Sequence, residues 1–569
     1  MKTTRTPRIL IAGLLAIAAS LNLYGGGGSQ AAPSGTGTVD RSNFNALGTF
    51  PLVKQKETLT IMVGVSNLST DMEKNWMTSY YEDKTNVRVN WVYAPAEQIK
   101  ERVNLALAGG DDIDLILGGG GFTTTEQLRL AEQGLLTPLQ DYIESDTVYM
   151  KRNLDSVPGW RNAITHPDGN IYAIPSYNEC LHCMYYTKMW VNREFLGNLN
   201  LKVPTTPAEF RDMLLAFKNR DANGNGDPND EIPFAGAYNG FADYSIKVDP
   251  YLMSAFVYDD GENRLYLENG TVTAAFQKRE FQEGLRYLRQ LYSEGLIYPA
   301  SFTQSWETRH QLNSQKYESV IGVMPNAHYI NLGGREEGEP TRWLEYEPIP
   351  PLKGPNGLQV TRYNYAAKFE LTGKYIPAAS KKAALVLRFL DWFGTEEGAT
   401  VVVFGGKGIG WDSADPGTLG IDGNPATFKV IQIHPSNPYY GIAKWGQGFP
   451  NFRTAAYRAG EQSPGDMMAS DGSGAEKFLY TKTLENYVPY GNQDLVIPPL
   501  YYSAEEASEL ALLATNINTY VEESIAKFVT GELNIDSGWN GFQNNLKNLG
   551  IDRYLQIIQT AYNKSAFAR

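Results

Sequence analysis

Apolar positions in the first part of the chain alternate between strand-like and helix-like spacing. The segments 57–65 (ETLTIMVGV), 86–94 (NVRVNWVYA) and 112–118 (DIDLILG) are dense in apolar residues and predict buried strands. Helical spacing follows each of them, for example over 95–110, where the pattern stops at two consecutive glycines. Strand–helix alternation of this kind predicts an α/β fold with a largely parallel sheet, whose ligand-binding loops follow the carboxyl ends of the strands.

Later segments predict a series of helices. The segment 202–221 has Thr205 or Thr206 as the cap, Pro207 in the first turn and Glu209 in a capping-box position. Further helical patterns occupy 124–143, 279–299, 380–406, 503–532 and 538–563. No internal repeat accompanies them, which argues against an adhesin or surface scaffold built from repeated units.

Length and charge narrow the class of protein. A chain of 569 residues is too long for one ordinary core and predicts two or more lobes. With 50 basic and 63 acidic residues the net charge is −13, which argues against nucleic acid or an anionic membrane as the main partner. The chain also has 35 Tyr and 10 Trp, enough to line a ligand site as well as the cores.

The N-terminus is typical of a secretory signal. Basic residues precede the short apolar stretch 9–24, and a Gly/Ser-rich tether follows. We therefore predict a signal peptide and the start of the tether over 1–33, a flexible linker over 34–56, and an exported protein that is extracellular or in the cell envelope. A lipoprotein signal would have Cys before the glycine run, where this chain has Tyr24, so membrane tethering at the N-terminus stays open.

The two cysteines, Cys180 and Cys183, are separated by only two residues. An even pair in an exported protein favours a disulfide over reduced thiols. Zinc binding would need more ligands than these two thiols and His182. A redox-active pair normally begins a helix, whereas this segment reads as extended chain, so redox catalysis is the weakest alternative.

The segment 221–232 (DANGNGDPNDEI) has oxygen donors at alternating positions, as in an EF-hand calcium loop. Gly226 occupies the position of the sharp turn, but the twelfth position is Ile232 where an EF-hand has Glu. We predict a modified structural calcium site that braces the end of the preceding helix, and an ordinary Asn/Gly/Asp turn is the alternative. The predicted ligands are Asp221, Asn223, Asn225, Asp227, Asp230 and Glu231.

Taken in order, several segments resemble the sugar- and oligosaccharide-binding extracellular solute-binding proteins (family 1, lipoprotein-type) of bacterial ABC importers. The matching segments are 172–179, 186–233, 281–304, 381–411 and 525–563. The resemblance implies a two-lobed fold of the type II periplasmic-binding-protein kind, closing by a hinge motion around a ligand and then docking on permease subunits. By this analogy lobe one holds 57–170 and 362–404, and lobe two holds 171–361 and 405–569.

A sugar site needs aromatic platforms for C–H faces and planar polar groups for hydroxyls. Residues in loop-like contexts of the expected cleft supply both, although core packing is the alternative for each aromatic residue. The candidates are Asn67, Trp306, Asn326, Tyr363, Asn364, Trp411 and Trp445.

These features together predict a monomeric receptor that captures a carbohydrate and has no enzymatic activity. The alternative is an exported glycoside hydrolase or lyase, which would need paired carboxylates in the cleft. No HExxH motif or Ser/His/Asp pattern is evident, and the chain has only five His residues.

Overall fold

The computed structural model describes residues 39–65, 71–95, 98–117, 122–240, 245–314, 318–334, 341–371, 373–434, 436–565 and 567. The predicted signal segment, most of the tether and the loop containing Asn67 therefore lie outside the described residues. Two larger sheets, each with its own hydrophobic core, form two lobes. Within the described residues, no helix combines the length and apolarity that a membrane span requires.

The first lobe is built on a four-stranded sheet in the order β12-β3-β1-β2. Strand β1 (Glu57–Val65) pairs in parallel with β2 (Val87–Pro95) and β3 (Leu115–Leu117), which confirms the three predicted strands. Strand β12 (Lys374–Tyr375) pairs antiparallel with β3, so a segment more than 250 residues later completes this sheet. The helices around it are α1 (Trp76–Thr85), α2 (Ile99–Gly109), α3 (Thr124–Glu132), α4 (Gln140–Asp146), α5 (Tyr149–Ser156), α6 (Trp160–Ile164), α13 (Ala383–Asp391) and α14 (Glu396–Phe404).

The second lobe is built on the sheet β10-β5-β9-β6. Its strands are β5 (Met189–Asn192), β6 (Ile232–Phe234), β9 (Ile321–Pro325) and β10 (Tyr346–Ile349), and a hairpin of β7 (Leu265–Glu268) and β8 (Thr271–Ala274) lies apart. Its helices are α8 (Arg193–Leu199), α9 (Pro207–Asn219), α10 (Pro250–Met253), α11 (Arg279–Ser293), α12 (Trp306–Asn313), α16 (Ala475–Asn486), α17 (Ala504–Thr530), α18 (Ile535–Asn548) and α19 (Ile551–Lys564).

The sequence predicts the start of helix α9 correctly, but it predicts some helices to be longer than they are in the structure. Helix α9 begins after Thr206, whose side chain accepts from the Glu209 backbone N–H, as its capping sequence predicts. The single helices predicted over 380–406 and 538–563 are each two α-helices in the structure. In the last case the break is at Gly550, which has a φ of 88° and so takes a left-handed conformation that ends α18. In 124–143 the first helix ends just before Gly134, where the sequence predicts a stop.

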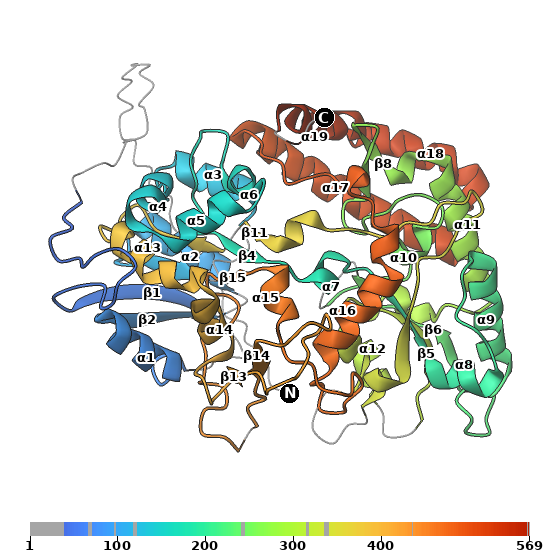
Figure 1. Ribbon diagram of the computed structural model, residues 1–569. Coiled ribbons are helices and arrows are strands. Elements are labelled where there is room, and N and C mark those ends of the chain that lie inside the picture. The colour runs from blue at the N-terminus through green and yellow to red at the C-terminus, as the bar shows by residue number, and fades with distance from the viewer. Residues whose placement is uncertain are drawn as a thin grey trace, which may run out of the picture. The chain divides into compact units, whose positions relative to one another are not determined.

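A small sheet joins the two lobes. It contains β4 (Ser176–Asn178), β11 (Phe369–Glu370) and β15 (Phe452–Arg453) in the order β11-β4-β15. Each strand belongs to a stretch of chain that runs from one lobe to the other, and Figure 1 shows the three strands between the two larger sheets. We call this group the connecting sheet.

The lobe boundaries stay a prediction. The cores and the predicted boundaries differ most clearly at Trp445 and Phe449, which pack in the core of the first lobe although 405–569 is predicted to belong to lobe two. The connecting sheet explains the difference, since β15 is where this part of the chain passes into the second lobe.

Candidate functional site

Two of the predicted ligand residues lie near the carboxyl end of β9. Trp306 is the first residue of α12, directly after the N-cap Ser305, and its half-buried ring stacks on His310 with centroids 4.8 Å apart. One turn later, Arg309 donates to the carbonyl of Pro325 at 2.8 Å. Helix α12 is thereby fixed to the end of β9, directly before Asn326.

Asn326 itself is completely buried. Its backbone carbonyl accepts from the indole of Trp190 at 2.8 Å, and its side-chain oxygen accepts from the His328 backbone N–H at 3.3 Å. Among the described residues, its side-chain NH2 group has no hydrogen-bond partner. A ligand could satisfy this donor only if the surrounding residues separate.

Tyr363 and Asn364 lie beside the short helix α7 (Leu181–Met184), where the chain leaves the connecting sheet. The Asn364 backbone N–H donates to the carbonyl of Met184 at 2.7 Å. The ring of Tyr363 packs against Tyr185 with centroids 5.2 Å apart, and this residue is buried. Of this pair, the half-buried Asn364 side chain is the more accessible to a ligand.

The two Gly-flanked tryptophans differ in their surroundings. Trp411 is half-buried at the start of β13 (Trp411–Ser413), which pairs with β14 (Phe428–Val430), and the Lys407 ammonium lies 5.7 Å from its ring centroid. Trp445 is only 4% exposed, and its indole N–H donates to Thr78 at 2.8 Å. Trp445 is therefore a core residue, contrary to its prediction as a ligand residue.

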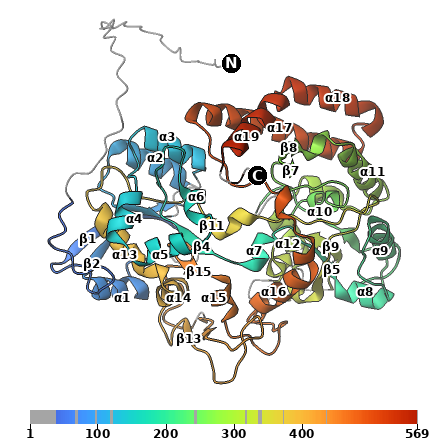
Figure 2. The ribbon, with the colours of Figure 1, turned by 45° about the horizontal axis from the view of Figure 1, so that its top comes forward.

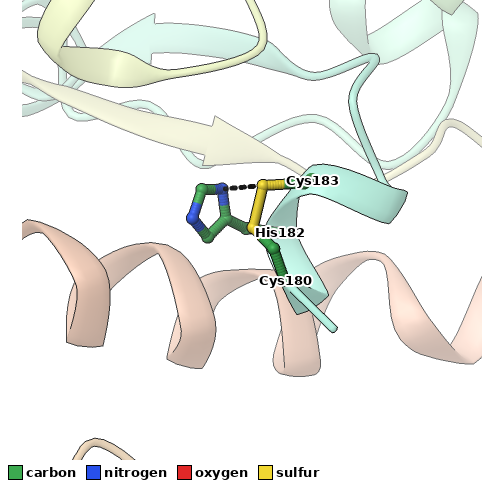
Figure 3. Close-up of side chains that lie close together, drawn as sticks. All are labelled: Cys180, His182 and Cys183. Carbon is green, nitrogen blue, oxygen red and sulfur yellow. Dashed lines mark hydrogen bonds between the residues drawn. A yellow bond between two sulfur atoms is a disulfide. The ribbon is translucent and has the colours of Figure 1, made fainter. Parts of the chain in front are cut away.

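The two cysteines form a disulfide on α7 (Figure 3). Cys180 has an extended backbone as the N-cap of this one-turn helix, whereas Cys183 lies within the helix, so the expectation of extended chain is correct only for the first cysteine. The ring of His182 lies beside the sulfur atoms, with its Nδ1 3.9 Å from the Cys183 Sγ. Because both sulfurs are used in the disulfide, they are not available as thiolate ligands for a metal ion.

A partly buried polar cluster that the sequence did not indicate surrounds His182. Glu476 on α16 accepts from Arg458 on α15 (Ala455–Ala459) at 2.6 Å and lies 3.5 Å from the His182 Nε2. Burial alone would raise the pKa of Glu476, but Arg458 and His182 hold it well below its ordinary value. Burial lowers the pKa of His182 and outweighs the opposing effect of Glu476. These residues are far apart in the sequence, so no local signal could have grouped them.

The predicted calcium loop connects α9 to β6 and is closed by its own side chains. The carboxylate of Asp221 accepts from the backbone N–H groups of Gly224 at 2.8 Å and Gly226 at 2.9 Å. These glycines have φ values of 78° and 95°, which only glycine adopts without strain. Asp230 accepts from the side-chain NH2 groups of Asn223 and Asn225 at 3.2 and 2.7 Å.

One carboxylate oxygen of Glu231 in this loop is a hydrogen-bond acceptor without a partner among the described residues. The Glu231 Oε1 accepts from the backbone N–H groups of Ala222 and Asn223, at 2.5 and 3.2 Å. The other oxygen, Oε2, is buried and has no hydrogen-bond partner among the described residues. Burial raises the pKa of Glu231. A buried acceptor without a partner, in a loop rich in carboxylate and amide oxygens, is the kind of group that a bound Ca²⁺ ion can satisfy.

Comparisons with known proteins identify the family. The model for bacterial extracellular solute-binding proteins matches residues 67–400, more than half of the chain. The fructooligosaccharide ABC transporter substrate-binding protein FusA of Streptococcus pneumoniae is 26% identical over 525 residues, covering 91% of this chain and 92% of that protein.

Solved structures agree with this match. The structure of FusA in complex with kestose has a TM-score of 0.71 and is 25% identical in sequence. The match covers 99% of the FusA chain and 89% of this chain. A solute-binding protein from Bifidobacterium longum infantis, described as binding HMO, has a TM-score of 0.73 at 20% identity over the same shares of the two chains. These likenesses confirm the predicted two-lobed α/β fold of the type II kind.

Solute-binding proteins are receptors, so these matches also favour the predicted binding role over the enzymatic alternative. The chain therefore belongs to the family of bacterial extracellular solute-binding proteins.

Proposed function

We propose that this protein is an exported receptor that binds a fructooligosaccharide between its two lobes and delivers it to an ABC permease. The observation that carries this proposal is the match to FusA, which extends over more than nine-tenths of both chains. Because the match includes both lobes and the connecting strands, it supports a common mode of ligand capture and not only a common lobe. In this proposal the protein acts as a monomer outside the cytoplasm, either extracellular or in the cell envelope.

Three accessible side chains are the proposed contacts with the sugar. Trp306 and Trp411 are both half-buried and offer aromatic surface for the C–H faces of a sugar ring, and Asn364 offers an amide for its hydroxyls. Asn67 remains in the proposal as a residue of the loop after β1, which lies outside the described residues. Asn326 and Tyr363 are buried and would contribute only if the residues around them move. Trp445 is not among the proposed sugar contacts, because it is buried in the core of the first lobe.

Binding of kestose to the purified protein tests the proposed function. Isothermal titration should show saturable binding of kestose, with affinity at least about tenfold higher than for alginate or galacturonan oligomers, a difference of about 1.4 kcal/mol. Trp306→Ala should weaken kestose binding by a similar factor because it removes an aromatic platform. Trp539→Ala is the matched control, since Trp539 packs against Phe542 on α18 within the second lobe.

Two results would contradict this function. One is tighter binding of an acidic oligosaccharide than of any fructooligosaccharide. The other is the release of shorter sugars during incubation, measured by chromatography, which would indicate an enzyme.

We propose in addition that the loop 221–231 binds a structural Ca²⁺ ion. Asp221, Asp230 and Glu231 would supply carboxylate oxygens, Asn223 and Asn225 amide oxygens, and Asp227 its backbone carbonyl. The orphaned oxygen of Glu231 supports this assignment. A solved structure of FusA is described as an EF-hand mutant, which indicates that a loop of this type occurs in that relative. When bound, the ion would neutralise the clustered carboxylates and fix the end of α9.

Removal of calcium is expected to lower the melting temperature and to leave kestose affinity nearly unchanged. At a free calcium concentration a hundredfold above Kd, binding stabilises the folded state by about 2.7 kcal/mol. Differential scanning calorimetry with and without chelator measures this effect. Asp221→Ala should abolish the calcium-dependent shift, whereas Asp212→Ala, an exposed residue of α9 outside the loop, should retain it. Identical melting curves with and without chelator would refute the site.

A further inference from the structure

Outside the connecting sheet, the segment 500–503 makes a second link between the lobes. Leu500 is buried in the core of the second lobe, and Tyr502 packs against the same core. Ser503 then caps α17 in a capping box with Glu506. The residues on both sides of Tyr501 are thus held firmly by the second lobe.

The side chain of Tyr501, in contrast, reaches the first lobe. Its hydroxyl donates to the backbone carbonyl of Ala163 on α6, and its ring packs on His166 with centroids 4.7 Å apart. Ala163 is buried in the core of the first lobe. Helix α17, which follows, also comes close to α3 of the first lobe (Figure 2).

His166 is held in place for this contact. It is buried, and the ring of Tyr172 packs beside it with centroids 5.4 Å apart. Its backbone N–H donates to the carbonyl of Asn170 at 2.8 Å, which closes a tight turn. Burial lowers the pKa of His166 to about 4, against the opposing effect of Asp168, so the ring that meets Tyr501 is neutral at neutral pH.

Helix α6 also packs on all three strands of the connecting sheet. Trp160, its first residue, lies against one aromatic residue of each strand, with ring centroids 5.1 to 6.5 Å apart. The three partners are Tyr177 of β4, Phe369 of β11 and Phe452 of β15. The contact between Tyr501 and α6 therefore lies close to the strands about which the lobes would rotate. Points near a rotation axis move little, so the contact can persist in open and closed states.

We propose that Tyr501 is a positioning residue for ligand capture, forming with α6 the second link between the lobes, besides the connecting sheet, and restricting their motion to closure. Three short strands in one sheet can bend in more than one direction, and a contact beside them removes some of those directions. A ligand-free protein without this contact samples more orientations that cannot close. Because apparent affinity falls with the fraction of competent molecules, ligand binding weakens even though Tyr501 does not touch the ligand.

Replacement of Tyr501 tests this role. The affinity measurement in this test rests on the proposed binding of a fructooligosaccharide. Tyr501→Ala should raise the Kd for kestose roughly three- to tenfold by lowering the competent fraction. Tyr501→Phe, which keeps the ring and loses the hydroxyl, should have a smaller effect. The matched control is Tyr287→Phe, because the Tyr287 hydroxyl donates to the carbonyl of Pro207 at 2.7 Å within the second lobe. Its Kd should equal that of the unchanged protein.

A distance measurement without ligand makes the test independent of the sugar. Spin labels on Asp83→Cys in α1 and Lys547→Cys in α18, both exposed, report the separation of the lobes. The distribution of distances should broaden in Tyr501→Ala and stay unchanged in Tyr287→Phe. If the unchanged protein fails to bind kestose, the proposed function is wrong and the distance distribution alone decides the role of Tyr501. An unchanged distribution in Tyr501→Ala would overturn the inference.

Discussion

Replacing Arg264 with alanine is expected to lower the free energy of unfolding by about 3–5 kcal/mol, because it leaves buried carboxylates without their counter-ion. The Arg264 guanidinium is almost completely buried in the second lobe. It lies 2.6 Å from Asp249 and 3.0 Å from Glu522 of α17, and it also pairs with Asp259. Burial alone would lower the pKa of Arg264, but the carboxylates hold it above its ordinary value. Without the guanidinium, the buried carboxylates lose the positive charge that lies beside them.

Urea unfolding of the variant, followed by a signal from the second lobe, measures this loss. Arg286→Ala is the control, since Arg286 pairs with Asp536 at 2.7 Å while their side chains are 44% and 75% exposed. Solvent screening limits the contribution of such a pair to at most about 1 kcal/mol. Adding Asp259→Asn to Arg264→Ala should recover part of the stability, because it removes one of the unpaired charges. Equal losses for Arg264→Ala and Arg286→Ala would show that the buried cluster does not stabilise the lobe.

Replacing Trp445 with alanine is expected to cost about 3–5 kcal/mol of stability, the range for removing a large aromatic side chain from a core. Its ring lies within 6.1 Å of the rings of five other aromatic residues, centroid to centroid. They are Tyr81, Trp91, Phe389, Phe393 and Phe449. The substitution leaves a cavity among them and deprives Thr78 of a hydrogen-bond donor.

The same variant separates a core role from a ligand-binding role. At a temperature where Trp445→Ala remains folded, its Kd for kestose should equal that of the unchanged protein. Trp411→Ala should behave oppositely, with weaker kestose binding and a smaller loss of stability, because Trp411 is half-buried on the hairpin β13–β14. Calorimetry and titration on both variants supply the comparison. Loss of binding in Trp445→Ala with an unchanged melting temperature would restore Trp445 as a ligand residue.

Trp411 and Trp445 also show why the candidate site could be predicted only in part. Both lie in glycine-rich sequence, which indicates a loop but does not state what the loop packs against. The structure brings Trp445 against Trp91, more than 350 residues earlier in the chain, and leaves Trp411 half-buried. Contacts over such separations have no local signal in one sequence. The cluster of His182, Arg458 and Glu476 was not predicted, for the same reason.

The sequence alone predicts the features that depend on residues close together in the chain. Strand β1, the capped start of α9 and the alternation of strands and helices in the first lobe follow from apolar spacing and capping chemistry, which act within a few residues. Only the tertiary structure decided that β12 completes the first sheet, that Trp445 is core and that Tyr501 joins the second lobe to α6. The physical reason is that burial and long-range pairing depend on which distant segments meet, whereas hydrogen bonding within a turn and side-chain periodicity depend on the local sequence.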